Sequence, residues 1–329
     1  MSGDTRKIPV KMKLHRVILS VASALLLLSG CRNGGQRDVQ DKPAAETAAG
    51  EIPPDELPLP EVPPSLTAPE DRAAYIIAHF WDELDFSDTL RSRDRAFMEQ
   101  NFVNYISLFP HAGPEALPAH IDRLLERAAA DSQCLDLVND LAEHYLDDPN
   151  SPMRDEEYYI LFLEGLLRLP GLSETERIRP AYRLQTAKKN RPGTTAADFT
   201  YTDRGGGRRT LHATRGKRLM LLFYDPACSH CSQILDGLRG SAVIAGLIAN
   251  RELSVLAVYT EGDRRLWDDT KTSLPMEWSV AIDESRIVER ELYALPALPV
   301  IYLLDGQKTV LLKDPTPAEL ETYLTDMMK

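Results

Sequence analysis

The sequence predicts an all-helical domain followed by an α/β domain, in which helices flank a central mixed β-sheet. From Glu70 to about Asn190, apolar residues recur at spacings of three and four. From Phe199 onward, short apolar strands alternate with helical stretches. The 329 residues exceed one typical domain. We therefore divide the chain into a signal peptide (1–30), a tether (31–69), a helical domain (70–190) and an α/β domain (191–329).

Residues 1–30 have the pattern of a lipoprotein signal peptide. Basic residues precede an apolar run at 17–28, which is too short for a bilayer, where roughly 20 residues are needed, but suits a secretory signal. Ser29 and Gly30 stand directly before Cys31, as at a lipidation site. An ordinary secretory signal with an incidental cysteine is the alternative, and the true start is Met1 or Met12. We expect acyl chains on Cys31 to anchor the protein in the cell envelope, on the periplasmic face of the outer membrane.

The segment from 32 to 69 is rich in proline and predicts an extended tether without a folded core. The whole chain has a net charge of −12, and the signal carries +4, which leaves −16 on the remainder. This acidity argues against binding to nucleic acid and against electrostatic docking on anionic lipid.

The helical domain is expected to contain about six helices. Two apolar stripes run from Ala73 to Leu84 and from Met98 to Phe109, and further helices are expected at 117–130, 133–146, 156–169 and 174–189. Aromatic and acidic residues alternate at 79–86, which fits a core stripe with a solvated face. Cys134 is expected to be a small core residue, with a regulatory or resolving thiol as the minor alternative.

The α/β domain is expected to contain strands at 199–202, 219–224, 254–259, 300–304 and 309–312. Helices are expected after Cys228, at 264–272, at 284–292 and from Pro317 to the end. The three glycines at 205–207 predict a hairpin turn between two edge strands. Pro299 is expected at the first residue of its strand, where a cis bond is tolerated.

The motif Cys228-Ser229-His230-Cys231 follows an apolar strand and opens a helix. A thiolate at a helix N-terminus lies beside unpaired backbone N–H groups and the positive end of the helix dipole. His230 can add positive charge nearby. We therefore assign Cys228 as the attacking thiolate and Cys231 as the resolving thiol, with a redox-active disulfide in place of a cofactor.

Other interpretations of the two thiols stay open. A structural zinc needs four ligands, and the sequence has no second Cys pair and no His-x-x-x-His, so we assign no metal residue. A metal-binding chaperone that uses these cysteines with a histidine, and a static disulfide in a non-catalytic envelope lipoprotein, remain as alternatives.

From about Ala197 to the end, the chain resembles the thioredoxin-like family, in particular its TlpA-like and bacterial lipoprotein branch. The matching pieces are Ala197-Asp198-Phe199, the stretch from Phe223 to Cys231, and Leu298-Pro299. The resemblance implies a cis-proline against the active-site disulfide, and Leu298 and Pro299 as residues that contact substrate. The preceding helical segment resembles an uncharacterised domain found ahead of thioredoxin-like domains, which we expect to select or position a partner.

The chain also departs from the family pattern. Ala227 stands where thioredoxins have Trp, and the nearest aromatic residue, Tyr224, is assigned to substrate contact. The Pro-x-x-x-Thr-x-x-Cys pattern of peroxide-reducing relatives is missing at Cys231. A histidine before the second cysteine is a DsbA-like feature of oxidants, whereas the TlpA-like branch is more often reducing, so the direction stays open. The resemblance implies exported proteins with cysteines or disulfides as partners, together with an unidentified electron donor or acceptor.

Overall fold

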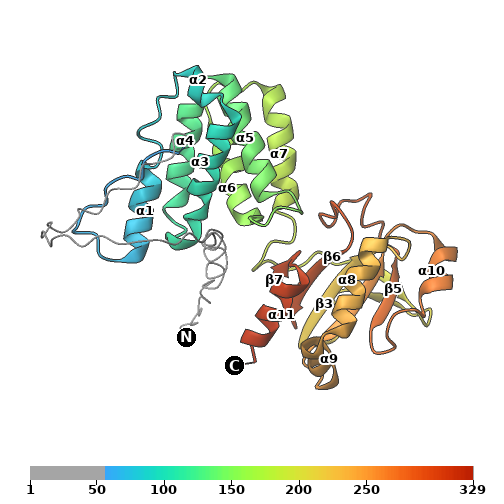
Figure 1. Ribbon diagram of the computed structural model, residues 1–329. Coiled ribbons are helices and arrows are strands. Elements are labelled where there is room, and N and C mark those ends of the chain that lie inside the picture. The colour runs from blue at the N-terminus through green and yellow to red at the C-terminus, as the bar shows by residue number, and fades with distance from the viewer. Residues whose placement is uncertain (1–55, 329) are drawn as a thin grey trace, which may run out of the picture. The chain divides into compact units, whose positions relative to one another are not determined.

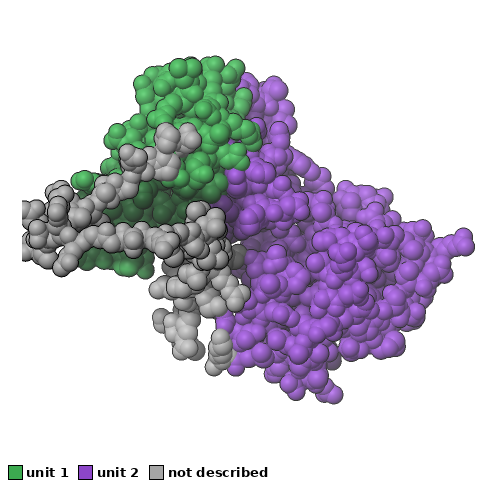
Figure 2. Space-filling model, in the orientation of Figure 1, with its two compact units in different colours: residues 1–138 green, residues 139–329 purple. Residues whose placement is uncertain are grey.

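The computed structural model describes residues 56–328, so the signal peptide, Cys31 and most of the tether lie outside the described residues. The chain divides into two compact units between Val138 and Asn139 (Figure 2). This division falls inside helix α5 (Ser132–Leu146). No helix within 56–328 has the length and apolar character needed to cross a bilayer.

The first unit contains α1 (Pro69–His79), α2 (Thr89–Ser92), α3 (Arg95–Ser107), a 3₁₀ turn (Phe109–His111), α4 (Leu117–Ala128) and the start of α5 (Figure 1). Trp81 and Tyr105 pack edge to face at 5.6 Å between ring centroids, in the core that the apolar stripes predict. Arg127 donates to the carbonyl oxygens of Trp81 and Leu84. The chain therefore turns at 80–84, and α1 is shorter than the apolar stripe.

The second unit begins with the rest of α5 and includes α6 (Glu156–Arg168) and α7 (Glu174–Ala187). The Asp155 carboxylate accepts the N–H groups of the first turn of α6, and Ser173 and Glu176 form a capping box at α7. The six longer predicted helices of the 70–190 segment are thus confirmed within the described residues. α6 and α7 belong to the same compact unit as the sheet. The domain boundary expected at residue 190 stays a prediction.

A seven-stranded sheet forms the centre of the second unit, in the order β2-β1-β5-β4-β3-β6-β7. The strands are β1 (Thr200–Asp203), β2 (Arg208–Thr210), β3 (Arg218–Tyr224), β4 (Ser254–Tyr259), β5 (Ser279–Asp283), β6 (Val300–Asp305) and β7 (Val310–Lys313). β3, β4 and β5 are parallel, and the other pairs are antiparallel. The expected mixed sheet with flanking helices is confirmed. The hairpin at 205–207 joins β1 and β2 as expected, but only β2 of this pair is an edge strand, because β1 also pairs with β5.

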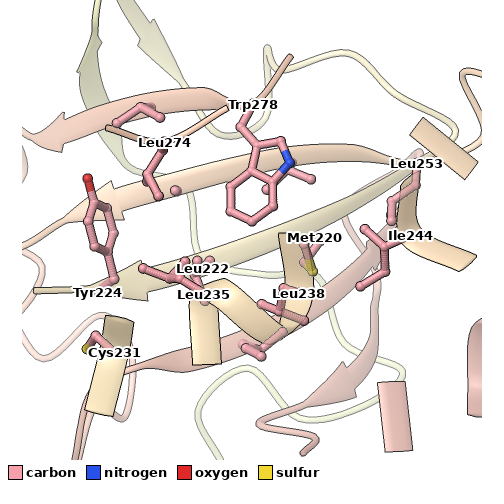
Figure 3. Close-up of a cluster of buried hydrophobic side chains, with 14 of the residues drawn as sticks. Met220, Leu222, Tyr224, Cys231, Leu235, Leu238, Ile244, Leu253, Leu274 and Trp278 are labelled. Carbon is pink, nitrogen blue, oxygen red and sulfur yellow. The ribbon is translucent and has the colours of Figure 1, made fainter. Parts of the chain in front are cut away.

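Side chains of β3 alternate between the two faces of the sheet. Met220, Leu222 and Tyr224 pack into a core (Figure 3) with residues of α8 (Ser229–Gly240), α9 (Ala242–Ala249), α10 (Arg264–Thr270) and α11 (Pro317–Asp326). Leu219, Leu221 and Phe223 pack on the opposite face, against aromatic residues of β1, β6 and the β5–β6 connection. β3 is therefore buried on both sides, which fixes the position of the loop that follows it.

Two expectations about the β5 region were wrong. No strand was expected at 279–283, where β5 lies between β1 and β4. A helix was expected at 284–292, where the chain forms turns. The Asp283 carboxylate accepts the N–H groups of Ser285 and Ile287, and Arg286 and Glu291 have left-handed backbone angles. The two left-handed residues interrupt the helical backbone that was expected here.

Candidate active site

Cys228 is the N-cap residue of α8, with extended backbone angles of φ −85° and ψ 121°. β3 ends at Tyr224, and a three-residue turn delivers the chain to the cysteine. The Cys231 backbone N–H donates to the Cys228 Sγ at 3.4 Å. The first sulfur therefore receives a hydrogen bond from the first turn of the helix, as an N-cap oxygen would.

The two thiols have opposite acidities. The pKa of Cys228 is lowered, first by the backbone N–H of Cys231 and then by the Cys231 thiol and the His230 N–H, against opposing desolvation and the charge of Asp225. Burial is the main cause that raises the pKa of Cys231 to about 12. Cys231 is 1% exposed, whereas Cys228 is partly accessible. One thiol is therefore open and readily ionised, and the other is covered and protonated.

The peptide bond between Leu298 and Pro299 is cis, as the family resemblance implied. β6 begins at the following residue, Val300, which pairs with Phe223 of β3. This register puts Pro299 level with the end of β3, where the cysteine loop leaves the sheet. Leu298 is half-buried and packs against the cores on both faces of the sheet.

The other predicted site residues have different surroundings. Tyr224 is 2% exposed, its hydroxyl has no hydrogen-bond partner among the described atoms, and its side chain extends away from Cys231 (Figure 3). Desolvation raises its pKa to about 12. The His230 side chain is exposed. Substrate contact by Tyr224 and a charge effect of the His230 ring stay predictions.

Asp225 is a residue of this site that sequence reasoning treated only as part of a turn. Its backbone oxygen accepts the Cys228 N–H at 3.2 Å, and its carboxylate accepts the Ala227 N–H at 2.9 Å. The Asp-Pro pair between a strand and the motif was the available signal, because aspartate commonly holds such turns.

Cys228 and Cys231 are present as free thiols, and Cys134 is a third free thiol with no exposed surface, in the core as expected. Among residues 56–328, no group of three or more His, Cys, Asp and Glu side chains could hold a metal ion. The arrangement supports nucleophilic attack by one sulfur, followed by attack of the other on the resulting disulfide.

Comparison with known proteins gives matches to both halves of the chain. Residues 192–312 match the AhpC/TSA family, and residues 30–190 match DUF5106, a domain of unknown function. The crystal structure of a thioredoxin-like protein from Bacteroides caccae is 37% identical, with a TM-score of 0.77, over 82% of this chain and 98% of that chain. The C-terminal domain of an uncharacterised protein from Bacteroides fragilis is 39% identical, with a TM-score of 0.41, over 42% of this chain and 99% of that chain. No curated protein matches.

Proposed function

The chain belongs to the thioredoxin-like family and is a thiol–disulfide oxidoreductase, and from that premise we propose that it exchanges disulfides with exported proteins while tethered to a membrane. The observation that carries the exchange reaction is the contrast between the two thiols. Cys228 is accessible and its pKa is lowered, first by the Cys231 backbone N–H. Cys231 is buried, and burial raises its pKa to about 12.

The proposed reaction transfers two electrons. The Cys228 thiolate attacks a disulfide of the partner, so that the partner's S–S bond breaks, a Cys228–partner bond forms and one partner thiolate leaves. Cys231 then loses its proton and attacks the Cys228 sulfur. The Cys228–Cys231 disulfide forms, the second partner sulfur leaves as a thiolate, and both partner thiolates take up protons. The partner is reduced and the protein is oxidised; the reverse sequence oxidises a partner dithiol.

Trapping tests this proposal directly. In a Cys231→Ala variant the second attack cannot occur, so we expect mixed disulfides with envelope proteins to accumulate on Cys228. The measurement is a non-reducing gel of acid-quenched cells, on which the high-mass species disappear when dithiothreitol is added. The matched control is the double variant Cys228→Ser/Cys231→Ala, which should trap nothing. Equal amounts of trapped species in the two variants would rule out the proposed role of Cys228.

Membrane tethering rests on the sequence around Cys31, which lies outside the described residues. Each buried methylene of an acyl chain contributes about 0.8 kcal/mol, so two or more chains suffice for stable anchoring. The proline-rich segment after Cys31 would leave the folded units free to reach partners away from the membrane surface.

We expect a Cys31→Ser variant to lose the anchor. In cells fed radiolabelled palmitate, the native protein should incorporate label and sediment with membranes, whereas the variant should remain unlabelled and appear in the soluble envelope fraction. Cys134→Ala serves as the control for loss of any cysteine and should keep the label. Label that persists in Cys31→Ser would refute lipidation at this residue.

A further inference from the structure

Asp225 accepts two hydrogen bonds within the active-site loop. Its backbone oxygen accepts the Cys228 N–H, and its carboxylate accepts the Ala227 N–H. One residue therefore holds both the turn that follows β3 and the N-cap of α8. Each hydrogen bond spans at most three residues, so Asp225 acts locally on the loop.

The Asp225 carboxylate also adds a negative charge beside both thiols. Burial is the main cause of the raised pKa of Cys231; the Asp225 backbone lowers this pKa, whereas the charge of the Asp225 carboxylate raises it. The Cys231 N–H is the main cause of the lowered pKa of Cys228, and Asp225 opposes it. Tyr224 of β3 and Tyr259 of β4 belong to the same buried cluster as Cys231, and His230 stands between the two cysteines in the first turn of α8.

We propose that Asp225 is a positioning residue for thiol exchange, which holds the active-site turn and whose charge makes the Cys228–Cys231 couple a stronger reductant. This inference deepens the proposed function and rests on it. A disulfide carries no charge, whereas the reduced pair carries a thiolate, so a neighbouring carboxylate disfavours the reduced form. Proteins whose reduced thiolate is stabilised are strong oxidants, and Asp225 acts in the opposite direction. Its charge thus counters the oxidising tendency expected from a histidine before the second cysteine.

Two variants separate the charge of Asp225 from its hydrogen bonds. Asp225→Asn keeps an oxygen that can accept the Ala227 N–H but removes the charge, and Asp225→Ala removes both. The measurement is the fraction of Cys228–Cys231 disulfide at equilibrium with graded mixtures of reduced and oxidised dithiothreitol. We expect Asp225→Asn to shift the equilibrium about threefold toward the dithiol, which corresponds to about 14 mV at 29.6 mV per tenfold change. The pH midpoint for alkylation of Cys228 should fall in the same variant.

The matched control is Asp236→Asn, which removes the same charge from the exposed surface of α8, where Asp236 pairs with Arg239. It should leave the equilibrium and the alkylation midpoint unchanged. Asp225→Ala should show the charge effect and also slower exchange, because the turn has lost its side-chain bond. An unchanged equilibrium in Asp225→Asn, or an equal shift in Asp236→Asn, would overturn this inference. Failure of the native thiols to form a disulfide that dithiothreitol reduces would instead overturn the proposed function.

Discussion

Replacing Cys228 with serine should lower the rate of disulfide reduction by about a thousandfold or more, because a hydroxyl at this position is not ionised near neutral pH. The structure makes Cys228 the accessible thiol of the pair, with a pKa lowered chiefly by the Cys231 N–H. Cys231 cannot substitute for Cys228, because Cys231 is buried and its pKa is raised to about 12, so that its thiol is protonated at neutral pH. The measurement is reduction of a disulfide-containing protein, with dithiothreitol as the source of electrons.

The pH dependence of the same assay gives a second readout. The thiolate is the reactive form of Cys228, and its pKa is lowered, so activity should be present above that pKa and be lost as the pH falls through it. The midpoint should lie below that of an ordinary cysteine thiol. Cys134→Ala is the control, because this thiol is buried and desolvation raises its pKa to about 11, so that its removal should leave the profile unchanged. Full activity in Cys228→Ser would refute the assignment of the nucleophile.

The sequence was sufficient to predict the parts of the site that depend on local bonding. Three features of the site are adjacent in the chain: a strand that is apolar on both faces, a turn, and a cysteine at the start of a helix. Their geometry therefore follows from a few residues. Pro299 could be placed as well, because a proline before an apolar run restricts where the strand begins. Asp225 was less visible, since its effect depends on where its carboxylate lies relative to two sulfurs.

Features that depend on distant contacts were not predicted. β5 is short, and only its pairing with β1 and β4 distinguishes its five residues from a loop. The false helix at 284–292 has a helix-compatible composition, but Arg286 and Glu291 adopt left-handed backbone angles, which interrupt an α-helix. α6 and α7 lie in the same compact unit as the sheet, and ion pairs in this unit join residues more than a hundred positions apart, such as Arg154 and Asp314.

A buried ion pair between Lys313 of β7 and Glu156 of α6 is central to these contacts. The Lys313 Nζ lies 2.6 Å from the Glu156 carboxylate and donates to the Ala187 backbone oxygen at 2.9 Å. The Lys313 side chain is 6% exposed and that of Glu156 is 20% exposed. Burial raises the pKa of Glu156 and lowers that of Lys313, and each charge opposes the shift of its partner. Each charge therefore favours the ionised form of the other group.

We expect Lys313→Met to lower the free energy of unfolding by about 3 kcal/mol, because it leaves the Glu156 carboxylate buried without its partner. The measurement is the urea midpoint of the second unit in the full chain. Lys217→Met is the matched control, since Lys217 pairs with Glu252 but is 68% exposed, and its loss should cost about 1 kcal/mol or less. A loss in Lys313→Met no larger than in this control would refute the importance of the buried pair.

The pH dependence of this loss distinguishes an unpaired charge from lost packing. Without Lys313, the pKa of Glu156 in the folded protein should rise further. A carboxyl group with a raised folded pKa stabilises the fold at pH values below its unfolded pKa, and this contribution is lost as the pH rises through the folded pKa. The loss in Lys313→Met should therefore shrink toward acid pH and be largest at neutral pH. The double variant Lys313→Met/Glu156→Leu removes both charges, and it should recover part of the lost stability at neutral pH. A packing defect alone would persist at acid pH and would not be relieved by the second substitution.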